Sequence, residues 1–264
     1  MNQTSMHPAP PARVNVLGVG ISAVNMQQAV SLLDGLVQAA DRKAYVCVAA
    51  AHSVLACRQD AELRRIFNRS LLTTPDGMPL VWISRLNGHR HVDRVYGPDL
   101  MLAVCERSLR SGHRHFLYGG APGVPEELAA RLQARFPGLQ IAGTFSPPYR
   151  PLDRPEEQVV LGEIEATHAH IVWVGLGTGK QERWMAEHLG IVAAPLMIGV
   201  GAAFDFLSGR KAQAPPWMRR AGLEWLFRLF SDPQRLWRRY AAYPWFLVLL
   251  LAQLTKLKRF PLDD

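Results

Sequence analysis

Short apolar runs alternate with longer amphipathic segments along most of this 264-residue chain. A short apolar run bounded by glycine, proline or polar residues predicts a buried strand, and apolar residues recurring every three or four positions predict a helix. We expect strands at residues 14–19, 45–50, 115–118, 140–143, 171–174 and 195–200. We expect helices at residues 25–40, 53–68, 97–111, 124–136 and 180–189, and one that ends at residue 166. This βα repetition predicts an α/β fold with a mainly parallel sheet and helices on both faces.

The two ends of the chain differ from this pattern. Residues 1–13 are polar and proline-rich and lack the basic start and apolar centre of a signal peptide, so we expect a disordered leader. From about Pro215 the pattern changes to arginine-rich helical segments that also carry tryptophans. The sequence therefore predicts an α/β domain at residues 14–214 and a basic, tryptophan-rich helical appendage at residues 215–264.

Positive charge is concentrated in this appendage. The chain has a formal net charge of +8, and residues 215–262 contain nine Lys or Arg residues against Glu224 and Asp232. The uncharged stretch at residues 240–255 is shorter than the ~20 apolar residues that span a bilayer, so we expect it not to span one. Basic residues beside tryptophans favour a segment lying on an anionic membrane surface, although such helices also pack on protein cores. No RNA- or DNA-binding motif accompanies the charge, so we expect no nucleic-acid partner.

The cysteine and histidine spacings indicate neither a cross-link nor a metal site. Cys47, Cys57 and Cys105 are an odd number without paired spacing, and no His or Cys residues stand at zinc-ligand intervals. The α/β part also contains no Asp-x-Asp pair, the usual metal bridge to a nucleotide diphosphate. We therefore expect a cytoplasmic protein without a metal or other cofactor, in which arginines and helix N-termini neutralise a leaving group.

Four glycine-containing segments follow predicted strands, at the edge where ligands bind in open α/β sheets. They are Asp76-Gly77, Gly119–Gly123, Gly175–Gln181 and Gly199–Asp205. Each segment alone is typical of a plain tight turn, but four at one edge predict a phosphate or nucleotide pocket. The candidate binding residues in and beside these segments are Thr74, Gly77, Gly119, Gly120, Gly175, Gly177, Lys180, Gly199, Gly201 and Asp205.

Two of the glycine patterns are similar to better-known nucleotide motifs without fitting them. Residues 175–181 have one residue too few between the outer glycines for a P-loop, and Gln181 stands where Ser or Thr would bind magnesium. Gly18-Val19-Gly20 lacks the third glycine of a dinucleotide motif, and no acidic residue closes the following strand. NTP hydrolysis and hydride transfer are therefore the weaker alternatives.

Three polar residues are candidates for the chemistry, and each has a plainer alternative. Asp76 stands where a strand ends and an apolar helix begins, which suits either a catalytic base or a helix cap. Arg94 could hold a diphosphate through two parallel hydrogen bonds, or pair with Asp93 or Asp99 on the surface. Gln181 opens a helix beside glycines, where it could contact a hydroxyl-rich ligand or cap that helix.

Several motifs occur in a fixed order along the chain and together carry a family resemblance. They are Thr74–Trp82, Arg94–Leu100, Val174–Gly177, Lys180–Glu182, Gly199–Phe206, Gly222–Leu226 and Asp232–Arg235. In sequence and spacing they resemble the WecG/TagA/CpsF glycosyltransferases, family 26 of the glycosyltransferases, over about residues 14–240. The resemblance implies a Rossmann-like catalytic domain and a C-terminal appendage that docks on a membrane.

The resemblance also implies an activity. This is the inverting, metal-independent transfer of a sugar from a UDP-sugar to a polyprenyl-diphosphate-linked saccharide, during surface or exopolysaccharide assembly, by a peripheral protein on the cytoplasmic face of the bacterial inner membrane. By motif, Asp76 is expected to be the general base, Arg94 a diphosphate binder and Gln181 a sugar or acceptor contact. The basic residues expected to meet the membrane or the acceptor diphosphate are Arg219, Arg220, Arg228, Arg235, Arg238 and Arg239.

The resemblance leaves several choices open. Family members use glucose, ManNAc or ManNAc uronic acid, and where many have a Thr-x-Asn pair this chain reads Ala49-Ala50-Ala51, without the two polar contacts. The alternative function is a non-catalytic UDP-sugar-binding scaffold of an envelope polysaccharide assembly complex, with a cytoplasmic dehydrogenase ranked below it. The acceptor length and the oligomeric state also stay open.

Overall fold

The computed structural model describes residues 10–39, 42–231, 233–234, 237 and 241–262. The chain divides into two compact units. Unit 1 contains Met26–Cys47 and Gly97–Lys211, and unit 2 contains Pro11–Asn25, Val48–Tyr96 and the C-terminal segment that starts at Ala212. The predicted division into residues 14–214 and 215–264 stays a prediction.

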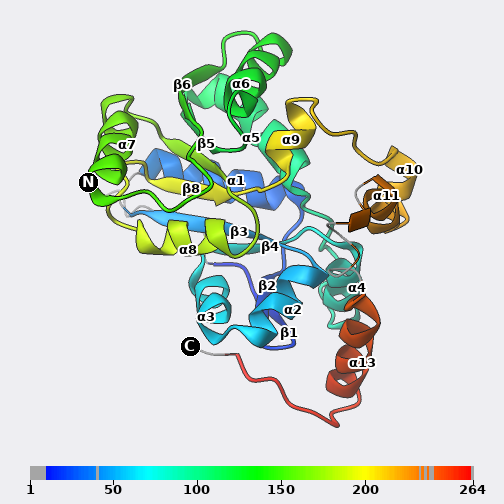
Figure 1. Ribbon diagram of the computed structural model, residues 1–264. Helices are drawn as coiled ribbons and strands as arrows, with labels where there is room; N and C mark the ends of the chain where they lie inside the picture. Colours follow the sequence, from blue (N-terminus) through cyan, green and yellow to red (C-terminus); the bar gives the residue numbers. More distant parts are fainter. Residues whose placement is uncertain (1–9, 40–41, 232, 235–236, 238–240, 263–264) are drawn as a thin grey trace, which may run out of the picture. The chain divides into compact units, whose positions relative to one another are not determined.

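Six strands form one sheet (Figure 1). Their order is β4 (Leu72–Pro75), β3 (Ala44–Ala49), β8 (Leu196–Gly199), β7 (Ile171–Gly175), β5 (Arg114–Gly119) and β6 (Gln140–Phe145). β3 pairs with β8, β8 with β7, β7 with β5 and β5 with β6, all in parallel. Ile171 to Val174 of β7 are all buried, as expected for a strand covered on both faces. This helix-flanked parallel sheet confirms the predicted Rossmann-like α/β class.

Helices of unit 1 cover its strands on both faces. In the described residues they are α1 (Met26–Ala39), α5 (Gly97–Ser111), α6 (Val124–Arg135), α7 (Arg154–Ala166), α8 (Lys180–Glu187) and α9 (Ala203–Leu207). α1 and α8 pack against β8 from opposite faces of the sheet (Figure 1). At the start of α7, the Asp153 carboxylate accepts from the Glu156 N–H at 2.9 Å and the Glu156 carboxylate accepts from the Asp153 N–H at 3.0 Å. Such a reciprocal cap satisfies two N–H groups and fixes where the helix begins.

The N-terminal part of unit 2 corrects one prediction. In place of a single strand at residues 14–19, β1 (Arg13–Val16) and β2 (Val19–Ser22) form a separate antiparallel two-stranded sheet. Leu17 and Gly18 make the turn, and their φ angles of 53° and 89° are the positive values that a type I′ hairpin turn requires. The apolar run therefore folds back on itself before the alternation of helix and parallel strand begins.

A second correction lies at Asp60. The helix expected at residues 53–68 is in fact two helices, α2 (Ala51–Gln59) and α3 (Ala61–Arg69). Asp60 is extended, and its carboxylate accepts from the Leu63 N–H at 2.9 Å. Because an N-cap aspartate satisfies an otherwise free N–H, it favours the start of a new helix over continuation of the old one. Unit 2 also contains α4 (Met78–Leu86), which follows β4.

The C-terminal segment of unit 2 is helical where it is described. Its helices are α10 (Pro216–Arg220), α11 (Glu224–Ser231) and α13 (Tyr243–Leu254). Among the residues that the structure describes, no helix is long and apolar enough to cross a membrane.

One side of α13 packs on the rest of unit 2. Phe246 and Leu249 are buried. The Gln253 amide donates to the backbone oxygen of Asn15 at 2.9 Å and accepts from the Leu17 N–H at 2.8 Å. The last helix is therefore tied to the β1–β2 turn by hydrogen bonds as well as apolar contacts. Packing on a core, the plainer alternative for the tail, thus holds for this side of α13.

Candidate active site

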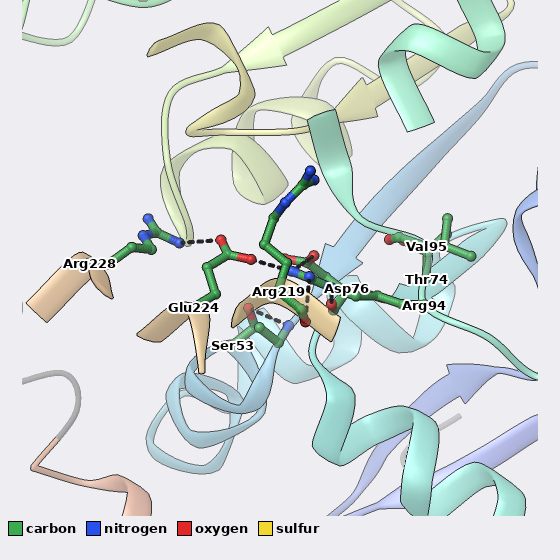
Figure 2. A network of polar contacts seen from close by, with 9 residues as sticks. Ser53, Thr74, Asp76, Arg94, Val95, Arg219, Glu224 and Arg228 are labelled. Atoms are coloured by element: carbon green, nitrogen blue, oxygen red, sulfur yellow. Dashed lines mark hydrogen bonds and ion pairs between the residues drawn. The ribbon is translucent and has the colours of Figure 1, made fainter. Parts of the chain in front are cut away.

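Asp76 stands at the point where β4 gives way to α4. Its backbone N–H donates to the Ala49 oxygen at 2.8 Å, which ties the turn to the end of β3. Gly77, in an extended conformation, is the N-cap of α4. Asp76 is therefore not the N-cap of α4, because the helix begins one residue later than that role requires. The Asp76 carboxylate is directed to Arg94 instead (Figure 2).

Arg94 joins the backbone and the side chain of Asp76. Its Nε donates to the Asp76 backbone oxygen and its Nη2 to Asp76 Oδ1 at 3.4 Å. The carboxylate of Asp93 accepts from the Arg94 backbone N–H and pairs with Arg85 at 3.4 Å, so it does not hold the Arg94 guanidinium. Only 17% of the Arg94 side chain is exposed. The guanidinium therefore belongs to the Asp76 turn, and the surface pair with Asp93 is not formed.

Two residues of α11 complete the charged group around Asp76, and sequence reasoning missed one of them. Glu224 Oε2 accepts from Arg94 Nη2 at 2.5 Å, and Glu224 Oε1 lies 3.8 Å from Arg228 Nη1 (Figure 2). Glu224 is buried although it begins a helix in the basic tail. An acidic residue among many arginines was the available signal, but its partner lies 130 positions away.

The Tyr96 ring lies beneath both arginines that approach this group. The Arg94 guanidinium carbon lies 4.2 Å from the ring centroid and that of Arg219 lies 5.8 Å from it. The Arg219 backbone oxygen also accepts from Arg94 Nη1 at 3.3 Å. Tyr96 is buried, and its hydroxyl has no hydrogen-bond partner among the residues that the structure describes. We call Asp76, Arg94, Tyr96, Arg219, Glu224 and Arg228 the Asp76 cluster.

The electrostatics of the cluster suit a base at neutral pH. Burial raises the pKa of Asp76 to about 6, with the negative charge of Glu224 adding to the rise and Arg94 and Arg228 opposing it. Burial alone would lower the pKa of Arg94, but the Asp76 and Glu224 carboxylates outweigh it, so its pKa is raised and it stays charged. A carboxylate with a pKa just below the working pH is ionised and still basic enough to accept a proton.

The glycines of unit 1 that follow β5, β7 and β8 are close together, because these strands are neighbours. Gly119 pairs with Gly175, and Val174 pairs with Gly199. A Cβ on Gly119 would lie 2.6 Å from the Gly175 backbone, and a Cβ on Gly175 would lie 2.7 Å from the Phe204 ring. These two glycines are therefore required by close packing, whatever else they bind. Gly177 differs, because its Cβ would meet nothing within 4 Å.

The start of α8 contains a buried acid and a buried amide. Glu182 Oε2 accepts from the Gly179 N–H at 2.5 Å, so Glu182 rather than Gln181 caps the helix. Gln181 Nε2 donates to Glu182 Oε1 at 2.9 Å, while the buried Gln181 Oε1 has no hydrogen-bond partner in the described part of the chain. Burial raises the pKa of Glu182 to about 7, against the hydrogen bonds from Gln181 and Gly179. We call residues 177–182 the α8 corner.

The other candidate residues have plainer surroundings. Thr74 Oγ1 donates to the Val95 oxygen at 3.5 Å in unit 2. In unit 1, Asp205 pairs with Lys211 at 3.0 Å and Lys180 is exposed.

The structure assigns the candidate residues to the two units as follows. Unit 2 contains Thr74, Asp76, Gly77, Arg94, Arg219 and Arg228, and unit 1 contains Gly119, Gly120, Gly175, Gly177, Lys180, Gln181, Gly199, Gly201 and Asp205. The Arg220 side chain and all of Arg235, Arg238 and Arg239 lie outside the described residues.

A parallel α/β sheet with glycine-rich strand ends and a half-buried carboxylate beside arginines is typical of enzymes that transfer a group from a phosphate-bearing donor. Comparison with known families agrees with this class. The model of the glycosyl transferase WecG/TagA/CpsF family matches residues 14–260, and the chain belongs to this family. The protein is therefore a glycosyltransferase.

Two curated relatives of the chain share one enzyme name. The chain is 30% identical over 193 residues to the N-acetylglucosaminyldiphosphoundecaprenol N-acetyl-beta-D-mannosaminyltransferase of Bacillus spizizenii (strain ATCC 23059 / NRRL B-14472 / W23), covering 73% of each chain. It is 29% identical over 202 residues to the enzyme of that name from Bacillus subtilis (strain 168), covering 76% of this chain and 77% of the relative.

Proposed function

We propose that the protein transfers a sugar from a UDP-sugar to a polyprenyl-diphosphate-linked saccharide, with inversion at the anomeric carbon and without a metal ion, in surface or exopolysaccharide assembly. The acceptor class is supported by the relatives, whose names specify an N-acetylglucosaminyldiphosphoundecaprenol acceptor. The observation that carries the mechanism is the Asp76 carboxylate, which is 21% exposed, held by Arg94, and raised in pKa to about 6.

In the proposed reaction Asp76 is the general base. Its carboxylate takes the proton of an acceptor hydroxyl while that oxygen forms a bond to the anomeric carbon of the donor sugar. The bond from this carbon to the UDP oxygen breaks on the opposite face, and the electron pair leaves with UDP. A single displacement of this kind inverts the anomeric centre, and one base suffices because UDP leaves as a stable anion.

Fixed positive groups of the chain neutralise the phosphates in this proposal. Arg94, Arg219 and Arg228 supply cations close to Asp76. In unit 1, a Cβ on Gly177 would meet nothing within 4 Å, so an anion can approach the backbone there. We assign the arginines of unit 2 to the acceptor diphosphate and the leaving group.

The choice of donor sugar is connected to the alanines at residues 49–51. A Cβ on Gly77 would lie 3.6 Å from the Ala50 Cβ, so this segment adjoins the Asp76 turn. Methyl groups there cannot hydrogen-bond a sugar hydroxyl or acetamido group. Because this segment offers fewer polar contacts beside the base, we expect the donor sugar to be selected by its shape. The candidate sugars are glucose, ManNAc and ManNAc uronic acid.

The direct test is a donor panel. Purified protein would be incubated with each UDP-sugar and a short-chain prenyl-diphosphate-linked N-acetylglucosamine, with UDP release and product mass as the readouts. We expect one donor to give a product heavier by one sugar residue, at a rate unchanged by EDTA. UDP-sugar binding with no UDP release from any donor would favour the scaffold alternative instead.

The outer face of α13 supports attachment to a membrane surface. Opposite the buried Phe246 and Leu249, this helix exposes large apolar side chains, and basic residues follow its end. The exposed apolar residues are Trp245, Leu247, Val248, Leu251 and Leu254. An apolar face flanked by lysines and an arginine is suited to the headgroup region of anionic lipid. A peripheral position on the cytoplasmic face of the inner membrane would place the enzyme beside its lipid-linked acceptor.

Point substitutions test this attachment better than truncation, because α13 also packs inside unit 2. We expect Trp245→Asn combined with Leu251→Asn to abolish co-flotation with anionic liposomes while leaving the thermal midpoint near that of the wild type. The control is Leu189→Asn with Ile191→Asn, which removes two exposed apolar residues of unit 1. Flotation retained by the α13 variant would contradict membrane attachment through this face.

A further inference from the structure

Glu224 is an unexpected residue in a segment expected to supply positive charge. It is the first residue of α11, and its side chain is only 11% exposed. Burial of a carboxylate is unfavourable unless the charge is paired and hydrogen-bonded. Its partners are Arg94 at 2.5 Å and Arg228 at 3.8 Å, so one acid bridges two arginines (Figure 2).

The hydrogen bonds of Arg94 indicate what this bridge does. A guanidinium has five N–H groups in a rigid plane. Arg94 donates from Nε to the Asp76 oxygen, from Nη1 to the Arg219 oxygen, and from Nη2 to both Asp76 Oδ1 and Glu224 Oε2. Four contacts in different directions fix the plane of the group. Three of these contacts are to Asp76 Oδ1, the Arg219 oxygen and Glu224 Oε2, and the contact to Glu224 is the shortest of the three. Glu224 belongs to the C-terminal segment.

We propose that Glu224 is a positioning residue for the transfer reaction. Its carboxylate holds the Arg94 guanidinium against Asp76 and places a negative charge beside this base. The inference rests on the proposed role of Asp76 and goes beyond it, because it gives the C-terminal segment a part in the chemistry separate from lipid or phosphate binding. The contact of Arg94 Nη1 with the Arg219 oxygen uses one of the two N–H groups on that nitrogen, and the other can donate to a phosphate oxygen.

The charge of Glu224 has a consequence for the pH at which the base works. The titratable groups around Asp76 are Arg94 and Tyr96 before α5 and Glu224 and Arg228 on α11, while the Arg219 guanidinium of α10 lies over the Tyr96 ring. Within this set Glu224 is the negative charge, and it raises the pKa of Asp76 while Arg94 and Arg228 lower it. Removing it would leave Asp76 among cations, as a carboxylate that is ionised at lower pH and is a weaker base.

The test compares pH profiles of kcat/KM for the acceptor in Glu224→Gln, Glu224→Ala and the wild type. Glutamine keeps the shape of the side chain and one acceptor oxygen but loses the charge. We therefore expect the acidic limb of the profile, where kcat/KM falls as the pH drops, to move down by at least about half a pH unit. Alanine also loses the contact with Arg94, so we expect the same shift together with a fall in kcat of about tenfold or more. A residue that only stabilised the fold would change the amount of active protein and not the position of the limb.

The matched control is Glu62→Gln, which removes one negative charge from an exposed position on α3 of the same unit. We expect it to leave kcat and the acidic limb unchanged. If Glu224→Gln does not fold, Glu224→Asp serves in its place. Aspartate keeps the negative charge, so the acidic limb should stay where it is, but its shorter side chain reaches Arg94 less well, so kcat should fall. A limb that is unmoved or moves upward in Glu224→Gln, or an unchanged kcat in Glu224→Asp, overturns the proposal.

The Asp76→Asn and Glu224 variants together separate the role of Asp76 from the role of Glu224. If Asp76→Asn keeps full turnover, Asp76 is not the base and the proposed mechanism fails. If Asp76→Asn is inactive while Glu224→Gln and Glu224→Ala behave like the wild type, Asp76 remains the proposed base and the proposed role of Glu224 is wrong.

Discussion

The Asp76 cluster and the α8 corner each bury a carboxylate with a raised pKa, yet the two carboxylates are held in different ways. Asp76 is partly exposed and lies beside the guanidinium of Arg94, which carries a full positive charge. Glu182 is fully buried, and the groups that hydrogen-bond to it are the neutral Gly179 N–H and Gln181 amide. Its pKa reaches about 7, higher than the value of about 6 for Asp76.

A raised pKa therefore does not by itself mark a catalytic base. Glu182 caps α8 from a position that no substrate atom reaches without local unfolding. Asp76 combines a pKa near neutrality with an exposed oxygen and adjacent cations, and these two features suit it to proton transfer beside phosphate groups. We therefore assign chemistry to the Asp76 cluster and helix stabilisation to Glu182.

Asp76→Asn is the substitution with the largest expected effect. A positioned base contributes ~100-fold to ~10,000-fold, so we expect kcat to fall by at least about 100-fold. UDP binding and the thermal midpoint should stay near the wild-type values, because asparagine keeps the size of the side chain. Asp99→Asn, at an exposed site on α5, is the matched control and should keep full turnover.

Glu182→Gln should affect stability rather than chemistry. The folded pKa of Glu182, about 7, lies above the ordinary value of 4.5, so the unfolded chain releases this proton first. As pH rises from 4.5 to 7, the folded state therefore loses roughly 2–3 kcal/mol of stability through this one group.

Glutamine cannot ionise, so the variant should lose this part of the pH dependence. Urea unfolding of both proteins between pH 4.5 and 7.5 would measure it, with kcat within a few-fold of the wild type. A fall in kcat as large as that of Asp76→Asn, with the fold intact, would mean that the two carboxylates had been assigned to the wrong roles.

Tyr96 variants should have the smallest effects, and they separate the ring from the hydroxyl. No described residue hydrogen-bonds the hydroxyl, so we expect Tyr96→Phe to change kcat by less than about threefold. Tyr96→Leu removes the face on which Arg94 rests, a contact of ~0.5–2 kcal/mol, and should cost about tenfold or less. Steady-state rates of the two variants give this difference directly, and equal losses would show that the hydroxyl matters after all.

Much of the parallel sheet could be predicted from the sequence because its signals are local. The apolar runs of β5 and β7 and the periodicity of α5 and α6 indicate their own elements. The β1–β2 hairpin was missed because Leu17 adopts a positive φ, which the usual turn residues signal and leucine does not. The break at Asp60 was missed although an N-cap residue was present, because the apolar periodicity continues through it.

The candidate site was predictable only in part, for a related reason. Asp76 stands where a strand ends and a helix begins, and Arg94 stands in a motif of the family resemblance, so the sequence could single out both residues. Glu224 is 130 residues from Arg94 along the chain, and nothing local distinguishes it from a solvated acid in a basic helix. Which of Gln181 and Glu182 caps α8 likewise depends on which side chain turns back to the Gly179 N–H.

The pH dependence of kcat/KM in the wild type and in Asp76→Asn tests the central claim most directly, because this ratio reports ionisations of the free enzyme. We predict that wild-type kcat/KM falls as the pH drops through about 6, the pKa of Asp76. The residual turnover of Asp76→Asn should lack this limb. A limb at the same pH in Asp76→Asn would contradict the assignment of Asp76 as the base.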